Sequence, residues 1–378
     1  TTYPIIGSAA FGVPLPLEAR NSAGNWVLFN DGARRGWVAA WLTNLSGDVF
    51  ALPVSTEIIG QPPSGGSPGP GPSTGFNLGG QTQTLGHPGL MRSAGMTWVK
   101  FQYKWSPGSD PQEIAGMVNA AHSQGFRVLL SIPGPLYPSS IDFSANTQFL
   151  QGVAGYGPDA IEVWNEMNLN REWPTGQINP TSYVNNMLAP GYRAIKAVNP
   201  NILVISGAPA PTGFHDGVTA WSDDRYIAGM AAAGAANYMD CIGVHYNAGA
   251  TSPDQSFGHP ADPGVGHYSW YFWPTYNLYA GTFPGKPVCF TEIGYVSGDG
   301  YPPLPSNFAW GGGTSTAEHA QWLGRAAQLA RSTGRVRLFI VFNVDFTFYG
   351  ADDPQAGYAI LRPDGSCPAC GLLAAAGQ

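Results

Sequence analysis

Two glutamates follow short apolar runs and could act as a pair. Glu166 closes the segment IEVWNE (161–166), and Glu292 lies in VCFTEIGY (288–295), 126 residues later (292 − 166). Two carboxyl groups that meet on one substrate can divide the work, one attacking as a nucleophile and one donating a proton. Cleavage of a glycosidic bond needs this division, because the leaving oxygen takes a proton while the anomeric carbon is attacked.

The rest of the chain must supply elements that bring the two glutamates together. After residue 75 the sequence alternates strand-like runs with helix-period segments. The strand-like runs are 76–80, 97–103, 127–133, 161–166, 202–209, 241–247, 288–295 and 337–346. The helical segments are 88–95, 110–125, 179–199, 224–235 and 316–334. Near-continuous apolar strands indicate burial on both faces, as in a parallel sheet.

Eight such units predict an α/β fold, a closed (β/α)8 TIM barrel. An open doubly wound sheet would want a glycine-rich phosphate turn after its first strand, and none is present. In a barrel the active site lies at the carboxyl ends of the strands. Glu166 and Glu292 would end the fourth and seventh strands and face each other across the mouth. The alternative is two ion-paired barrel glutamates.

The motifs VWNEMNL (163–169) and CFTEIGY (289–295) resemble those of the clan A glycoside hydrolases. Family 39 looks nearest, with family 5 close behind, and the resemblance covers residues 76–378. It implies that Glu166 is the general acid/base, that Asn165 bonds the 2-hydroxyl of the substrate, and that Glu292 is the nucleophile. It also implies a retaining reaction on a β-linked polysaccharide or oligosaccharide, with no metal and no organic cofactor.

His245 ends the sixth run in GVHYN and is expected to line the site, the alternative being a structural histidine. Related families usually carry His-x-Tyr here, and that tyrosine bonds the nucleophile. In this chain Tyr246 directly follows the histidine and Asn247 takes the usual tyrosine position. Tyr246 and Tyr295 are therefore the candidate partners of Glu292.

Three further polar residues end predicted strands. Lys100 stands on the second strand, where many relatives have an arginine near the nucleophile, and could hold Glu292 ionised as a point charge. Gln102 shares its face through strand alternation. Asp345 lies on the eighth strand, where many relatives have a tryptophan. It could contact sugar hydroxyls or pair with an arginine.

Aromatic residues gather in the predicted strand-end loops: Trp105, Trp173, the run Trp270-Tyr271-Phe272-Trp273, and Trp310. Flat rings make good platforms for the apolar faces of sugars. Trp173, Trp273 and Trp310 are the expected platforms, although ordinary packing explains any single ring equally well. The long loops 247–270 and 296–315 favour an extended cleft.

A linker of Gln, Pro, Ser, Gly and Thr at 61–75 separates residues 1–60 from a catalytic domain at 76–378. β-Prone runs at 14–20, 25–31 and 36–42 predict a small all-β barrel. The order YPIIG, Gly12, Asn25-Trp26, Gly36-Trp37-Val38 and Gly47-Asp48 resembles the bacterial Src-homology-three-like (SH3-like) domain. That family's usual first strand is missing, so the sequence would start inside the domain. The resemblance implies cell-wall contact, and the alternative is a spacer.

The amino-acid composition narrows the range of possible binding partners. With 17 Lys and Arg against 24 Asp and Glu, the net charge of -7 argues against nucleic acid. No apolar stretch is long enough for a membrane span.

Cys241 and Cys289 are expected to be buried thiols, whereas Cys367 and Cys370 could form a disulfide or stay free. Low charge with many Gly, Pro and Trp resembles secreted carbohydrate-active proteins, so we expect a secreted or cell-surface location.

The sequence therefore predicts a secreted retaining glycoside hydrolase. Two alternatives remain at this point. One is a non-catalytic carbohydrate-binding or wall-attachment protein on a degenerate barrel, suggested by the unusual residues that end the second, sixth and eighth strands. The other is a peptidoglycan enzyme, suggested by the N-terminal module.

Overall fold

The computed structural model describes residues 14–21, 26–32, 34–40, 43, 45–55, 75–350 and 352–377. These residues form two compact units, a smaller one made chiefly of residues before 73 and a larger one made of later residues. None of the helices among them is long and apolar enough to cross a lipid bilayer.

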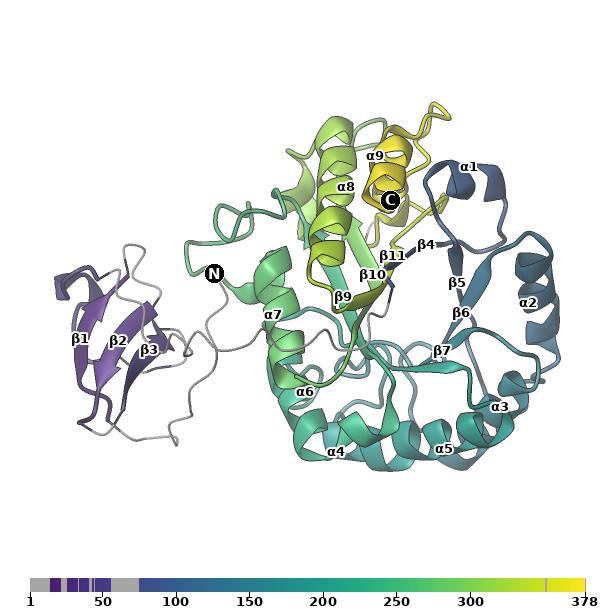
Figure 1. Cartoon of the computed structure of the whole chain (residues 1–378), viewed down its shortest axis with the longest axis horizontal. Helices are drawn as coiled ribbons and strands as arrows, with labels where there is room; N and C mark the ends of the chain where they lie inside the picture. The colour runs from purple at the N-terminus through teal and green to yellow at the C-terminus, as the bar shows by residue number, and fades with distance from the viewer. Residues whose placement is uncertain are drawn as a thin grey trace. The chain divides into compact units, whose positions relative to one another are not determined.

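The smaller unit contains a three-stranded antiparallel sheet in the order β1-β2-β3 (Figure 1). Its strands are β1 (Leu17–Arg20), β2 (Trp26–Asn30) and β3 (Arg35–Ala39). Each lies within or at the edge of one of the expected β-prone runs. The YPIIG segment, Gly12, Asn25 and residues 61–74 of the linker lie outside the described residues. The Src-homology-three-like barrel therefore stays a prediction.

The larger unit is built on eight parallel strands in the order β8-β7-β6-β5-β4-β11-β10-β9. They are β4 (Asn77–Gln81), β5 (Trp98–Gln102), β6 (Arg127–Ile132), β7 (Ala160–Val163), β8 (Leu203–Ser206), β9 (Ile242–Gly249), β10 (Val288–Tyr295) and β11 (Val336–Val341). A parallel bridge between Ile205 and Cys241 links the two end strands. The predicted (β/α)8 barrel is confirmed, with all eight strands in the expected places.

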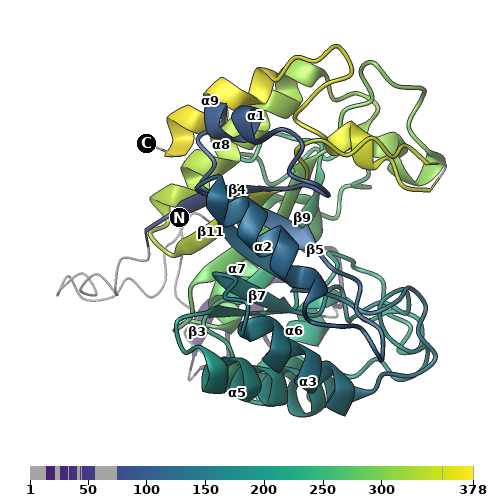
Figure 2. The same ribbon diagram turned by 90° about the vertical axis from the view of Figure 1, so that its right-hand side faces the viewer.

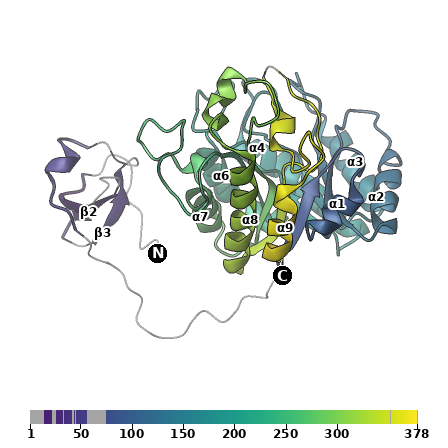
Figure 3. The same cartoon turned by 90° about the horizontal axis from the view of Figure 1, so that it is seen from above.

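Helices cover the outside of the strands, as Figures 1 and 2 show for α2, α3 and α5 beside β5, β6 and β7. The α-helices are α1 (Pro88–Ser93), α2 (Glu113–Ser123), α3 (Phe143–Ala154), α4 (Pro180–Tyr183), α5 (Ala189–Val198), α6 (Asp223–Ala232), α7 (Phe272–Thr282), α8 (Thr316–Ser332) and α9 (Pro368–Gly377). Figure 3 shows α8, α9 and α1 side by side.

Three of these helices, α3, α7 and α9, were not expected from the sequence. Helix α3 contains a serine, an asparagine, a threonine and a glycine, which have low helix propensity, but Asp142 caps it by accepting a hydrogen bond from the backbone N–H of Ala145 at 2.9 Å. Helix α7 begins at Phe272, within the aromatic run that the sequence placed in a loop. Its buried rings pack on the barrel, so tertiary packing overrides weak local propensity.

The barrel interior is filled rather than hollow. Its apolar layer consists of Trp98, Leu129, Ala160, Leu203, Ile205, Cys241, Cys289, Leu338 and Ile340. Two residues further along three of these strands, the interior carries Lys100, Glu162 and Thr291, all fully buried. A polar layer therefore lies between the apolar plug and the mouth.

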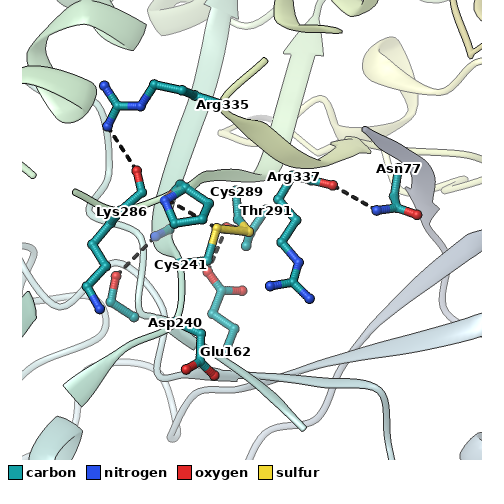
Figure 4. Close-up of a disulfide and its surroundings, with 12 residues drawn as sticks. Asn77, Glu162, Asp240, Cys241, Lys286, Cys289, Thr291, Arg335 and Arg337 are labelled. Atoms are coloured by element: carbon teal, nitrogen blue, oxygen red, sulfur yellow. Dashed lines mark hydrogen bonds between the residues drawn. A yellow bond between two sulfur atoms is a disulfide. The ribbon is translucent and has the colours of Figure 1, made fainter. Parts of the chain in front are cut away.

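Cys241 and Cys289 form a disulfide between the start of β9 and β10 (Figure 4). The expectation of two buried thiols is wrong, because both side chains face the same barrel interior with their Cα atoms 5.9 Å apart. Cys367 and Cys370 form a second disulfide at the first turn of α9, which decides between the two alternatives left by the sequence.

Candidate active site

Glu166 lies in an irregular turn directly after β7. The backbone of Trp164 (φ 76°) and Glu166 (φ 41°) occupies the left-handed region, which is costly for residues other than glycine. Tertiary hydrogen bonds hold the turn: the Trp164 indole donates to the Glu172 carbonyl at 2.9 Å, and the Glu166 N–H donates to the Ala208 carbonyl at 2.9 Å. Strain concentrated at one strand end is typical of a functional turn.

The Trp164 ring is buried between two other tryptophans, with ring centroids 6.4 Å from Trp105 and 5.9 Å from Trp173. Gly134 lies against its edge, and a Cβ there would come within 2.4 Å of the ring. Trp173 is only 1% exposed and donates to the Gln177 carbonyl. The expectation that Trp173 is a sugar platform is wrong, because its ring supports the turn from within the core.

Glu292 on β10 is held at both carboxyl oxygens. Lys100 Nζ donates to Oε1 at 2.9 Å, and Asn247 Nδ2 donates to Oε2 at 3.0 Å. Burial alone would raise the pKa of Glu292, but the positive charges of His245 and Lys100 and these two hydrogen bonds hold the pKa below its usual range. Glu292 is therefore an anchored, ionised carboxylate.

His245 lies between the two glutamates. Its Nδ1 is 3.1 Å from Glu166 Oε1 and 3.8 Å from Glu292 Oε2, and the side chain is fully buried. Burial alone would lower the pKa of His245, but the charges of Glu292 and Glu166 outweigh it and raise the pKa. One ring nitrogen and one oxygen from each glutamate all lie within 4.8 Å of one another.

These three side chains could in principle offer ligands to a metal ion. Lys100, however, already places a positive charge 2.9 Å from Glu292. A metal ion would add a further positive charge beside Lys100 and His245, whose pKa is raised, so the donor set fits a proton-transfer site better than a metal site.

Tyr246 and Tyr295 do not contact Glu292, and Asn247 does. The two tyrosines are fully buried outside the barrel, with ring centroids 5.8 Å apart, and the Tyr246 hydroxyl donates to the Trp270 carbonyl. Strand alternation is the reason, because it places Asn247 on the same face of β9 as His245 and turns Tyr246 outward. That parity was the signal that could have identified Asn247.

The other strand-end residues differ in what they contact. Lys100 meets Glu292, whereas Gln102 is exposed at the end of β5. Asp345 accepts a hydrogen bond from Thr82 Oγ1 at 2.7 Å and lies 2.9 Å from His87 Nδ1. Its partners are thus a threonine and a histidine rather than the arginine considered from the sequence.

The remaining expected platforms are only partly exposed. Trp273 is half-buried and packs on the barrel core through α7. Trp310 is half-buried, with its ring centroid 5.3 Å from that of His259, which in turn stacks on Trp270. More fully exposed rings occur in the loops after β6, β8, β9 and β11: Tyr137, Phe214, Phe257 and Phe348, each more than half exposed. Sequence reasoning missed them because it considered chiefly tryptophans.

Glu172 is a further carboxyl that the sequence analysis did not single out. It is 5% exposed, and its Oε1 lies 3.5 Å from Asn165 Nδ2. Burial and the charge of Glu166 raise the pKa of Glu172 to about 8. Its position in the same loop, six residues after Glu166 (172 − 166), was the available signal.

Glu172 should make stability depend on pH. Its pKa rises from 4.5 to about 8 on folding, so the folded state keeps a proton that the unfolded state releases. The free energy of unfolding should therefore fall as the pH rises across that window, by up to about 1.4 kcal/mol per pKa unit. Glu172→Gln should remove this loss and raise the melting temperature relative to wild type above pH 8. Melting curves across the window test this, with exposed Glu113→Gln as the control, and equal pH dependence of Glu172→Gln and wild type would contradict it.

No protein-family model and no curated protein matches this sequence. Among solved structures, a family 39 glycoside hydrolase from the gut symbiont Bacteroides cellulosilyticus WH2 is similar over 93% of this chain and 69% of its own, at 17% identity and a TM-score of 0.57.

Two other solved structures are similar over most of their own length. An endo-1,4-β-mannanase from Rhizomucor miehei matches 80% of this chain and 94% of its own, at 13% identity and a TM-score of 0.50. A GH10 endoxylanase from a sugarcane soil metagenome matches 79% and 97%, at 12% identity and a TM-score of 0.51. At these identities the likeness establishes the fold, a (β/α)8 barrel.

Proposed function

We propose that this protein is a retaining glycoside hydrolase that cleaves a β-linked polysaccharide or oligosaccharide. The observation that carries the proposal is the approach of Glu166, which follows the fourth barrel strand, and Glu292, which lies on the seventh: an oxygen of one carboxyl group is within 4.8 Å of an oxygen of the other. Retaining enzymes hold their two carboxyl groups about 5 to 5.5 Å apart, whereas inverting enzymes leave about 6.5 to 9.5 Å for a water molecule. The short separation favours double displacement.

In the first step a Glu292 oxygen bonds to the anomeric carbon while the glycosidic C–O bond breaks, and Glu166 gives its proton to the leaving oxygen. In the second step the Glu166 carboxylate takes a proton from water. The water oxygen bonds to the anomeric carbon, and Glu292 departs as a carboxylate. The ionised state of Glu292 suits attack, His245 orients Glu166 at 3.1 Å, and Asn165 would bond the 2-hydroxyl of the sugar.

The substrate class rests on the similar structures and on the loops. Two of those structures are an endo-acting mannanase and an endoxylanase. In this chain long loops follow β9 (250–271) and β10 (296–315), and exposed rings stand in the first of these loops and in the loops after β6, β8 and β11. Such loops suit an extended polymer better than a closed pocket does.

A secreted or cell-surface location belongs to the same proposal. The two disulfides are in keeping with an oxidising compartment, because cytosolic thiols are usually kept reduced. Contact with the cell wall through the N-terminal unit is proposed on the sequence resemblance alone.

The test is hydrolysis of a panel of β-glucans, xylans, mannans and galactans, with the anomeric form of the first product followed by proton NMR. We expect one class to be cleaved with retention of configuration. Release of the inverted anomer would contradict Glu292 as nucleophile. Binding with no new reducing ends would favour a non-catalytic carbohydrate-binding protein, and muropeptide release from purified walls would favour a peptidoglycan enzyme.

A further inference from the structure

A third carboxyl group, that of Glu162, lies in the barrel interior below the catalytic pair. Glu162 is on β7, four residues before Glu166 (166 − 162), and is fully buried. Thr291 Oγ1, on the residue preceding Glu292, donates to Glu162 Oε1 at 2.6 Å. Figure 4 shows Glu162 and Thr291 together beside the disulfide of the interior. A carboxyl group thus occupies the polar layer between the apolar plug and the active site.

Glu162 is linked to each of the two catalytic glutamates through one intervening side chain. Its Oε2 lies 3.4 Å from Lys100 Nζ, and Lys100 bonds Glu292 at 2.9 Å. Its Oε1 lies 3.9 Å from His245 Nε2, and the other nitrogen of His245 is 3.1 Å from Glu166. Burial alone would lower the pKa of Lys100, but Glu162 and Glu292 together raise it, so Lys100 remains an ammonium.

Burial of Glu162 lowers the free energy of unfolding relative to burial of a group that only fills space. A buried carboxylate loses its hydration, and Oε2 of Glu162 has no hydrogen-bond partner among the described residues. Apolar side chains of similar volume usually fill such a position at lower cost. The presence of Glu162 therefore calls for a role that a leucine or methionine would not serve.

The charge balance around Lys100 changes during the proposed reaction. Before attack, the ammonium has two anionic neighbours, Glu292 and Glu162. When Glu292 becomes a glycosyl ester, its negative charge disappears, and Glu162 is the carboxylate that still faces Lys100. We propose that Glu162 is a positioning residue for Glu292: it is the counter-ion of Lys100 while Glu292 is esterified, and through Thr291 it fixes the part of β10 that carries Glu292. This inference rests on the proposed function.

Loss of the Glu162 charge should affect the chemical step more than binding. Lys100 would then be compensated by Glu292 alone, which would hold that carboxylate more strongly and make it a weaker nucleophile. The ester would also leave a buried ammonium without a counter-ion. Both effects raise the barrier to the covalent intermediate, whereas the contacts with the sugar stay the same.

The experiment compares Glu162→Gln with wild type on the polysaccharide that wild type cleaves. We expect kcat to fall by about 10- to 100-fold with KM near its wild-type value, the size of loss known for side chains that hold metal ligands in place, because Glu162 would hold a catalytic group in place in a comparable way. The acid limb of the pH profile of kcat/KM should move to lower pH, because Lys100 would stabilise ionised Glu292 without competition from the Glu162 carboxylate. Glu162→Asp keeps the charge, so it should recover part of kcat and leave the acid limb in place.

Asp223→Asn is the matched control. Asp223 is also a fully buried carboxyl, bound by the hydroxyls of Tyr268 and Tyr279 at α6, and the substitution makes the same change from acid to amide. It should leave kcat and the acid limb unchanged.

Wild-type kcat and an unmoved acid limb in Glu162→Gln would overturn the inference. Equal losses of kcat in Glu162→Gln and Glu162→Asp, with no shift of the acid limb of kcat/KM, would also overturn the inference, since they would indicate that Glu162 has a purely structural role. If Glu162→Gln does not fold, Thr291→Val tests the inference instead, because it removes the 2.6 Å hydrogen bond to Glu162. We expect this variant to have a lower kcat than wild type. An unchanged kcat would overturn the inference.

The failure of this inference can be told apart from failure of the proposed function. If wild type cleaves no polysaccharide, the function is wrong. NMR titration of the carboxyl groups in wild type and Glu162→Gln then still tests the electrostatic link: we expect Glu292 to titrate at lower pH in the variant, and identical titrations would overturn it.

Discussion

Glu292→Ala should lower kcat by roughly 10⁴-fold or more, the size of loss typical for a residue that forms the covalent bond. Without this carboxylate no group remains to bond the anomeric carbon, and water cannot enter with the same alignment. The fold should survive, because Glu162 remains 3.4 Å from Lys100 as a counter-ion. Initial rates on the cleaved polysaccharide, with melting curves for both proteins, provide the measurement.

Rescue by azide provides a second measurement on Glu292→Ala. A small anion can enter the space left by the Glu292 carboxyl and attack the anomeric carbon in one displacement, so rescue should yield a glycosyl azide of inverted configuration. Glu113→Ala removes an exposed carboxyl from α2 and should keep full activity. A folded Glu292→Ala protein with wild-type turnover would rule out the assignment of Glu292 as nucleophile.

Glu166→Ala should lower kcat on polysaccharide by roughly 10²- to 10⁴-fold, as expected for loss of a general acid. The loss should be much smaller on aryl glycosides with acidic phenols, because a good leaving group departs without protonation. Rates on a series of aryl glycosides, plotted against the acidity of the phenol, measure this difference. The slope should be steeper for Glu166→Ala than for wild type.

The second step distinguishes Glu166 from Glu292. With Glu166→Ala, azide should attack the glycosyl ester of Glu292, and the product should be a glycosyl azide of retained configuration. Opposite configurations from the two variants would establish the two roles independently of any rate. Equal losses on all leaving groups would instead mean that Glu166 does not protonate the leaving oxygen.

The sequence was sufficient for the barrel and for the strands that carry the two glutamates. The residues of the apolar runs 128–133 and 288–295 are buried on both faces of the sheet, so their pattern depends on the sheet itself and little on distant contacts. The order of the runs along the chain then gives each strand its place in the barrel. This is why Glu166 and Glu292 could be assigned to the fourth and seventh strands before any coordinates.

The tertiary structure decided which side chain of β9 serves Glu292, whereas Lys100 was already a candidate partner from the sequence. Asn247 rather than Tyr246 reaches Glu292, because closure of the barrel determines which face of β9 points inward. The link from Glu162 through Lys100 joins β7, β5 and β10, and no local pattern reveals a distance between three strands. The Cys241–Cys289 disulfide likewise depends on the facing of two interior side chains. Local periodicity determines which segments become strands, whereas contacts between side chains depend on how those strands close around one another.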